Sequence, residues 1–270
     1  MNDIDVAPDA DALAHLAAQA FCSSAARAIA QRGKFTVALS GGRTPKALYE
    51  LLARGASYQS SLRWEDVYFF FGDERHVPPD HVDSNFRMAN EALFKPASVP
   101  LENVFRVRAE LPDADEAASI YQRTMINFFS PDLALEDGFP VFDLILLGTG
   151  PDGHTASLFP ESSALTERQN WVVANWVAKF ASRRITLTFP VLNRAREVLI
   201  LVSGEDKAPI INELFGQSDP ERHYPIQQVD PRRGRKHWLL DRAAYHLVNG
   251  SSALANFRPD LDAGTLHKTR

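Results

Sequence analysis

Side chains that could do chemistry gather where an apolar run in the middle of the chain ends. Residues 142–147 are mostly apolar, which is typical of a strand buried on both faces of a parallel sheet. The turn that follows, Gly148–His154, contains three glycines together with Asp152 and His154. Glycine permits positive φ angles and close approach of the backbone to a ligand. Because open α/β sheets carry their chemistry at the carboxyl ends of the strands, this turn is the first candidate for a catalytic site.

Within this turn, His154 is a candidate general base, since the pKa of imidazole lies near neutrality. Asp152 could orient the imidazole or stabilise its protonated form. A histidine–aspartate pair taken alone is more often structural than catalytic. Its place in a glycine turn, with basic residues after two other apolar runs, favours a catalytic interpretation.

A second glycine turn, Ser40–Pro45, follows the predicted strand 35–39 and precedes a predicted helix over 46–53. We expect Thr44 to be the N-cap of that helix and Pro45 to be its first residue. Free backbone N–H groups at such a helix start bind anions, most often phosphate, and Arg43 adds a fork of donors. The alternative is a tight turn without a ligand. The combination of serine, arginine and a helix start favours phosphate.

Charged residues also follow two other predicted strands. The run 67–71 ends in Gly72-Asp73-Glu74-Arg75, where the acids could serve acid–base chemistry and Arg75 could bind a phosphate or an oxyanion. The run 197–203 is followed by Lys207, which suits a phosphate charge. The alternatives are a solvated turn with a local ion pair at the first place and an ordinary surface lysine at the second.

Strands and helices alternate along the chain, which predicts a mostly parallel, doubly wound α/β sheet flanked by helices. We expect one domain over residues 1–270, with a core over about 10–248 and a loosely ordered tail over 249–270. The other predicted helices span 9–32, 85–94, 113–129 and 207–215, and the other predicted strands span 103–107, 171–177, 185–189 and 238–240.

Composition narrows the class of protein. The formal net charge is −5 with both signs mixed along the chain, which argues against nucleic acid and anionic membranes as partners. A single cysteine, Cys22, excludes an internal disulfide and a cysteine-based zinc site. The start of the chain is acidic, unlike a secretory signal, and no apolar run approaches the roughly 20 residues of a membrane span. We therefore expect a cytoplasmic protein.

Five motifs occur together in an order that resembles the 6-phosphogluconolactonases. They are Ser40-Gly41-Gly42-Arg43-Thr44-Pro45, Gly72-Asp73-Glu74-Arg75-His76-Val77, Asp83-Ser84-Asn85, the segment from Gly148 to Pro160, and Arg184-Ile185-Thr186-Leu187-Thr188. The resemblance spans roughly residues 10–248. It implies hydrolysis of 6-phospho-D-glucono-1,5-lactone to 6-phospho-D-gluconate in the oxidative branch of the pentose phosphate pathway, without metal or cofactor.

The resemblance and the chemistry together assign expected roles. His154 would be the base, Asp152 its partner, Arg75 the group that faces the oxyanion or orders the substrate, and Asp73 a contact to sugar hydroxyls. The residues expected to bind the substrate and its phosphate are Ser40, Gly41, Gly42, Arg43, Thr44, Gly150, Gly153, Arg184 and Lys207. Arg183 competes with Arg184 for the phosphate, and the motif favours Arg184.

A serine nucleophile is the less favoured mechanism. Ser40 and Ser157 could suggest a Ser-His-Asp hydrolase, but neither stands in a Gly-x-Ser-x-Gly elbow. An activated water is sufficient because a lactone is an activated ester.

Two other functions remain open at this point. Glucosamine-6-phosphate deaminases share the resemblance but carry a carboxylate before the proline of the glycine-turn motif, where this chain reads Ser157-Leu158-Phe159-Pro160 and Glu161 follows one step late. A sugar-phosphate sensor of a transcription regulator would need a DNA-binding segment, and only about one helix precedes the first predicted strand. The expected partner is therefore a small-molecule substrate, and the expected state is a monomer or a weak homodimer.

Overall fold

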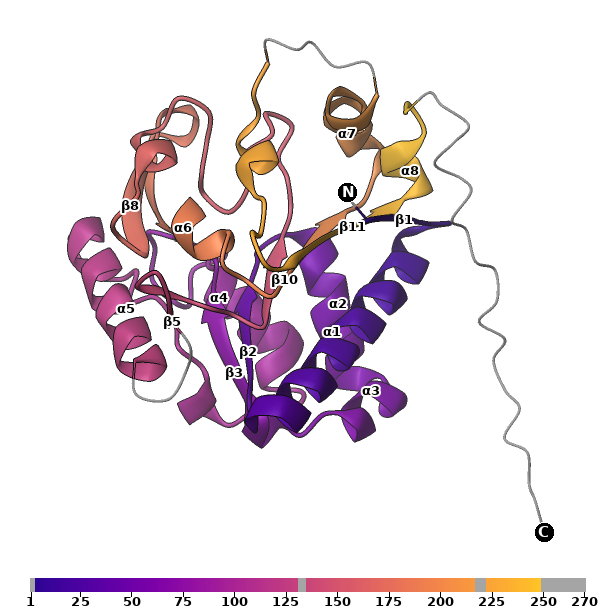
Figure 1. Ribbon diagram of the computed structural model, residues 1–270, viewed down its shortest axis with the longest axis horizontal. Coiled ribbons are helices and arrows are strands. Elements are labelled where there is room, and N and C mark those ends of the chain that lie inside the picture. The colour runs from indigo at the N-terminus through magenta and orange to yellow at the C-terminus, as the bar shows by residue number, and fades with distance from the viewer. Residues whose placement is uncertain (1–2, 131–134, 217–221, 249–270) are drawn as a thin grey trace.

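One parallel sheet of six strands forms the centre of the molecule, in the order β1-β11-β10-β7-β2-β3 (Figure 1). The structure is a computed structural model and describes residues 3–130, 135–216 and 222–248. The doubly wound, mostly parallel α/β arrangement expected from the sequence is confirmed. The expected loose tail, residues 249–270, lies outside the described residues.

The elements have the following bounds. The strands are β1 (Asp3–Ala7), β2 (Phe35–Leu39), β3 (Val67–Phe71), β4 (Asp73–Arg75), β5 (Leu135–Glu136), β6 (Phe139–Pro140), β7 (Leu144–Leu147), β8 (Val172–Val177), β9 (Ser182–Leu187), β10 (Glu197–Val202) and β11 (Arg235–Asp241). The helices are α1 (Ala10–Arg32), α2 (Arg43–Arg54), α3 (Ala56–Ser61), α4 (Asn85–Ala89), α5 (Ala114–Phe129), α6 (Phe189–Leu192), α7 (Ala208–Phe215) and α8 (Arg242–Tyr245).

Local sequence explains the first helix and the strands beside it. Asp9 caps α1 by accepting from the backbone N–H of Ala12 at 2.8 Å, and Gly33 ends the helix in the left-handed conformation. The next strand, β2, is buried along its whole length, as are all four residues of β7. Apolar runs without polar alternation therefore became interior strands, because helices cover both faces of the sheet.

A buried carboxylate explains why the run that precedes the glycine turn is not wholly apolar. Asp143 accepts hydrogen bonds from the backbone N–H and the hydroxyl of Thr36 at 2.9 and 3.0 Å, and it pairs with Arg32 at 2.8 Å. These contacts tie the start of β7 to β2. Burial of the charge is tolerated because the carboxylate is fully paired.

The winding of the sheet reverses between β2 and β7. From β2 the chain moves outward to β3, then returns to β7 on the other side and continues to β10 and β11. The crevice outside the carboxyl ends of two such strands is the usual ligand site of an open α/β sheet. Here it receives the turns Ser40–Thr44 and Gly148–His154.

A second sheet of three antiparallel strands, in the order β4-β9-β8, extends from the carboxyl end of β3. Gly72 joins the two sheets, since its N–H donates to the carbonyl of Leu39 in the large sheet and its carbonyl accepts from Leu187 in the small one, both at 2.8 Å. The sequence predicted strands over 171–177 and 185–189. Strand β8 agrees closely with the first, but β9 begins earlier and ends at Leu187, because Phe189 and Pro190 form the first turn of α6. The place of both strands in a separate sheet was not expected. A strand's partner depends on long-range packing rather than on its own residues.

Helices α1, α2 and α3 gather on one side of the large sheet, α7 and α8 lie on the other, and α5 packs beside β8 (Figure 1). The buried apolar side chains form one continuous cluster that includes residues of both main sheets. Within the described residues, no helix combines the length and the apolar character that crossing a membrane requires.

Several local features differ from what the sequence predicted. The N-cap of α2 is Gly42 rather than Thr44, because the positive φ of Gly42 (104°) lets the chain enter the helix earlier, and Pro45 becomes its third residue. Residues 103–107 form no strand; a single bridge joins Val104 to Phe69, after a turn held by the side chain of Asn103. Strand β1 was not expected at all, and it pairs with β11, which is longer than the 238–240 expected.

Candidate active site

The glycine turn after β7 is built so that the imidazole of His154 folds back over it. The N–H of Gly150 donates to the carbonyl of His154, and the N–H of Gly153 donates to the carbonyl of Gly150, both at 3.0 Å. A Cβ on Gly150 would lie 2.0 Å from the imidazole Cε1, so only glycine leaves room for the ring. Gly153 has a φ of 69°, which glycine adopts at little cost. The position of the histidine therefore requires a glycine at 150, and the backbone conformation of the turn favours one at 153.

The predicted pair of His154 and Asp152 is formed. Nδ1 of His154 makes a short hydrogen bond to Oδ1 of Asp152, and Oδ2 of the same carboxylate lies 3.3 Å from the ammonium of Lys179. The ring of Phe159 stacks on the imidazole at a centroid distance of 3.9 Å. With Nδ1 donating to the carboxylate, Nε2 is the nitrogen that carries the lone pair.

Burial and neighbouring charges set the protonation of the pair. Burial lowers the pKa of His154 below its ordinary value, the charges of Asp152 and Asp73 raise it in part, and that of Lys207 lowers it further. Burial raises the pKa of Asp152, but the hydrogen bond from His154 and the contact with Lys179 bring the net pKa below its ordinary value. At neutral pH the imidazole is thus neutral and the carboxylate charged, which is the state that a general base requires.

Asp73 lies at the junction of the two sheets and is buried. Its Oδ2 accepts from the hydroxyl of Ser157 at 2.6 Å, and its Oδ1 accepts from the amide of Asn85 at 3.2 Å. The hydroxyl of Ser157 therefore donates to Asp73 and not to His154. This arrangement lacks the hydrogen bond from serine to histidine that activates a serine nucleophile.

Glu74, which the sequence offered as a second acid, stabilises the local fold through hydrogen bonds to backbone groups. Its buried carboxylate accepts backbone N–H groups of Arg75, Asn85 and Phe86 at 2.7–2.8 Å, and the hydroxyl of Ser84 at 3.1 Å. Burial raises the pKa of Glu74; the backbone hydrogen bonds lower it, but the net pKa stays above its ordinary value. Glu74 holds the start of α4 against β4, and in doing so places Asn85 beside Asp73.

Arg75 and Arg184 occupy facing positions of β4 and β9 in the small sheet. Nη1 of Arg75 donates to the carbonyl of Asp83 at 2.6 Å, and the guanidinium of Arg184 lies 5.4 Å from the ring centre of Phe180. In both side chains Nε is buried without a hydrogen-bond partner among the described residues. Burial and the charge of Arg75 lower the pKa of Arg184. Arg183, the competitor, is exposed and paired with Asp115 at 3.2 Å.

The turn after β2 presents backbone donors beside these residues. The hydroxyl of Tyr49 fixes Ser40, accepting from its N–H at 3.1 Å and donating to its carbonyl at 2.9 Å. A Cβ on Gly41 would lie 2.0 Å from the side-chain oxygen of Asn85, so this backbone touches the residue that also contacts Asp73. Arg43 is largely exposed, with its guanidinium 3.7 Å from Asp206.

The predicted residues thus come together from several strand ends. The turns Ser40–Thr44 and Gly148–His154 follow neighbouring strands, Asp73 and Arg75 continue from β3, and Arg184 is brought in by the small sheet. Lys207 lies in a 3-10 turn after β10 and is close enough to lower the pKa of His154. Sequence reasoning missed Asn85 as a contact of Asp73, although it stands in a motif that was noted, and it missed Lys179, which no local pattern marks.

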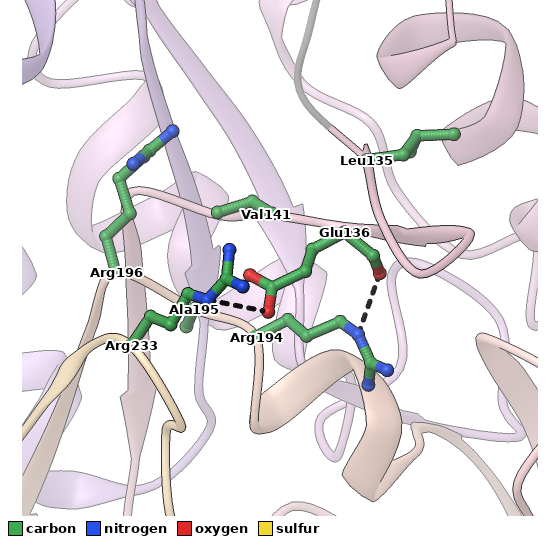
Figure 2. A pocket seen from close by; sticks show the side chains of 7 residues that line it. All are labelled: Leu135, Glu136, Val141, Arg194, Ala195, Arg196 and Arg233. Carbon is green, nitrogen blue, oxygen red and sulfur yellow. Dashed lines mark hydrogen bonds and ion pairs between the residues drawn. The ribbon is translucent and has the colours of Figure 1, made fainter.

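A cavity of about 240 Å³ lies at the opposite edge, beside the amino ends of β7 and β10 (Figure 2). Its arginines already have partners: Arg194 donates to the carbonyl of Glu136 at 2.8 Å, and Arg233 lies 3.5 Å from the Glu136 carboxylate. None of the predicted site residues lines it. In the part of the chain that the structure describes, no three histidine, cysteine or acidic side chains are grouped as metal ligands.

Comparison with known proteins gives one consistent family. Residues 8–238 match the family model described as glucosamine-6-phosphate isomerases/6-phosphogluconolactonase. The chain is 43% identical over 219 residues to a 6-phosphogluconolactonase of Synechocystis, covering 81% of this chain and 86% of the relative. It is 38% identical over 247 residues to the human 6-phosphogluconolactonase, covering 88% of each.

Solved structures agree with this result. A crystal structure named devB protein superposes with a TM-score of 0.80 at 33% identity, over 90% of this chain and 98% of that one. The 6-phosphogluconolactonase from Trypanosoma cruzi superposes with a TM-score of 0.79 at 28% identity, over 90% of this chain and 96% of that one.

Proposed function

The chain belongs to the glucosamine-6-phosphate isomerase/6-phosphogluconolactonase family, and we propose that it hydrolyses 6-phospho-D-glucono-1,5-lactone to 6-phospho-D-gluconate with a water activated by His154. The lactonase activity rests on the relatives named above. One observation carries the mechanism: Nδ1 of His154 is held by Asp152, which leaves Nε2 as a proton acceptor at the topological switch point of the sheet.

The reaction then proceeds in two proton transfers. Nε2 of His154 takes a proton from water as the oxygen attacks C1 of the lactone, and a tetrahedral oxyanion forms. Its collapse breaks the bond between C1 and the ring oxygen, and the imidazolium returns the proton to that oxygen. Asp152 stabilises the imidazolium between the two steps. One water is consumed and the ring opens to the acid.

The substrate is held mainly through its phosphate. We assign the phosphate to Arg184, Lys207 and the turn Ser40–Thr44, where Gly41 and Gly42 offer backbone N–H groups and Arg43 a further charge. Arg75 lies beside Arg184, and we assign to its charge the ordering of the phosphorylated substrate and the stabilisation of the oxyanion formed at C1. Asp73 contacts sugar hydroxyls. Gly150 and Gly153, which the sequence offered for substrate binding, act instead through the turn that they form, because the imidazole of His154 and the ring of Tyr224 occupy the space beside them.

The proposed mechanism needs no metal or cofactor. The reaction belongs to the oxidative branch of the pentose phosphate pathway, and we place the protein in the cytoplasm. The protein acts on a small molecule as a monomer or a weak homodimer. Size-exclusion chromatography with light scattering, with and without 6-phosphogluconate, measures that state.

A coupled assay that generates the lactone in place tests the proposal. It follows 6-phosphogluconate, corrected for spontaneous ring opening, in wild type, His154→Ala and the control His15→Ala, which changes an exposed histidine of α1. We expect His154→Ala to lower kcat by about 100-fold or more and His15→Ala to leave it unchanged.

Other outcomes of the same assay are informative. Activity retained in His154→Ala would contradict the assigned base and direct the search to Asp73. Absence of lactonase activity in the wild type, with release of ammonia from glucosamine 6-phosphate, would replace the proposal by the deaminase. Absence of both activities with retained binding of the sugar phosphate would replace it by a sensor.

A further inference from the structure

The β8–β9 hairpin reaches the catalytic pair at its tip, residues Ala178–Phe180. There Lys179 places its ammonium 3.3 Å from Oδ2 of Asp152, while Oδ1 of the same carboxylate holds Nδ1 of His154. The two oxygens of Asp152 therefore face different residues, Oδ1 facing His154 and Oδ2 facing Lys179. Lys179 comes 27 residues after Asp152 in sequence, so only the fold joins them.

The same hairpin tip also contacts Phe159, the residue that packs on the imidazole of His154. The ring of Phe180 meets that of Phe159 edge-on at 5.9 Å, and Phe159 is the ring that stacks on the imidazole. Ala181 ends the tip in the left-handed conformation with a φ of 44°. Two adjacent side chains of the hairpin thus contact residues that hold His154: Lys179 contacts Asp152, and Phe180 contacts Phe159.

We propose that Lys179 is a positioning residue for His154: it fixes the Asp152 carboxylate in the orientation that receives Nδ1–H and offsets part of its charge, and so extends to lower pH the range in which Nε2 can accept a proton. This inference rests on the proposed function, because it assigns a role within that mechanism. It concerns a residue outside the five sequence motifs.

The charges around His154 determine the direction of the effect. Asp152 faces it from its own turn, Asp73 from β4, Lys207 from the 3-10 turn after β10, and Lys179 from the hairpin through Asp152. Two carboxylates are thus opposed by two lysines. Removal of Lys179 leaves the carboxylates in excess, which stabilises the imidazolium and raises the pKa of His154.

The size of the effect is limited by solvent. Lys179 is about half exposed, with 52% of its side chain accessible, so water and salt screen its charge. We expect Lys179→Met to raise the pKa of His154 by roughly 0.3–1 unit at low ionic strength and by less in high salt. Lys179→Arg keeps the charge and should remain close to wild type.

NMR titration of the histidine Cε1–H signals tests the pairing directly. The His154 signal is assigned by its loss in His154→Ala, and the titration is repeated in Lys179→Met, Lys179→Arg and the control Lys95→Met, which removes an exposed lysine elsewhere. A rise in Lys179→Met, rescued by arginine and absent in the control, is the expected result. A His154 titration unchanged in Lys179→Met would overturn the proposal.

The pH profile of kcat/KM, measured in the same variants, tests the catalytic part. We expect its acid limb to move up in Lys179→Met by the shift seen in the NMR titration. A shifted NMR titration with an unmoved acid limb would overturn the role of Lys179 in catalysis, and it would show that His154 is not the base. An unmoved titration in an enzyme that still depends on His154 would instead leave the proposed function intact and reject Lys179 alone.

Discussion

Arg75 and Arg184 lie directly opposite each other on antiparallel strands, and within the described residues neither guanidinium forms an ion pair with a carboxylate. Like charges in facing positions of a sheet destabilise it by a few tenths of a kcal/mol up to about 1 kcal/mol. An anion bound between the two guanidinium groups would offset this repulsion and so explain the arrangement. The proposed phosphate and the oxyanion formed during the reaction are anions of this kind.

Replacement of either arginine by glutamine should weaken use of the phosphorylated substrate. A hydrogen bond to a charged group contributes about 1.5–3 kcal/mol, so we expect Arg184→Gln and Arg75→Gln each to lower kcat/KM by roughly 10- to 150-fold. Steady-state kinetics with the phosphorylated lactone, compared with glucono-1,5-lactone, measures the loss. For Arg184→Gln the defect should be confined to the phosphorylated substrate.

Arg183→Gln is the matched control for these variants. Arg183 is the sequence neighbour of Arg184 but is exposed and pairs with Asp115. We expect its kinetics to match wild type. A loss in Arg183→Gln equal to that in Arg184→Gln would contradict the assignment of the phosphate to Arg184.

Ser157→Ala separates an activated water from a serine nucleophile. The Ser157 hydroxyl donates to Asp73 at 2.6 Å and makes no bond to His154, so its removal should cost less than about tenfold in kcat through looser positioning of Asp73. A covalent nucleophile would be indispensable, with a loss of several orders of magnitude. Rapid-quench experiments that trap an acyl-enzyme in the wild type would also count against activated water.

The low pKa of His154 predicts the pH dependence of the reaction. A general base is active when neutral, so if His154 has the proposed role, activity is present above its pKa and is lost as the pH falls through it. Because burial lowers that pKa, the acid limb of kcat/KM should lie below the ordinary histidine value of about 6.5. Asp152→Asn removes a charge that raises the pKa, so it should move the limb lower still and reduce kcat by about tenfold or more. A limb that moves up in Asp152→Asn would refute the pairing.

The strand ends that carry the site should depend on two buried tyrosines. The hydroxyl of Tyr121 accepts from the N–H of Phe71 at 2.7 Å and donates to its carbonyl at 3.1 Å, as Tyr49 does for Ser40. Tyr121→Phe leaves a buried donor and acceptor without partners, so we expect a loss of about 1–3 kcal/mol in the free energy of unfolding, measured by urea denaturation. In Tyr68→Phe the lost hydroxyl has no hydrogen bond among the described residues, and stability should hardly change. Equal losses in both variants would show that the hydrogen bonds at Phe71 contribute nothing.

Local sequence was sufficient to predict several elements and the pair of Asp152 and His154. Strands β2 and β3 were predicted with their observed bounds, because each is an apolar run ended by a polar or glycine residue. Helix α1 was predicted from its alanine content and the helical spacing of its apolar residues, with Gly33 as its end. Asp152 and His154 meet because they lie two residues apart in one tight turn. Contacts between near neighbours are set by backbone conformations that the residues themselves favour.

The remaining features of the site depend on contacts between distant segments. The motif that contains Arg184 could be noted in the sequence, but its position opposite Arg75 follows from the pairing of β4 with β9 in a separate sheet. Lys179 reaches Asp152 only because the β8–β9 hairpin folds over the glycine turn. A strand's alternation states which residues share a face, whereas its partner and register are chosen by the packing of the whole core. The sequence alone therefore determined the chemical groups and their local turns, and tertiary structure decided which charges face one another, because those pairings join residues that no local conformation brings together.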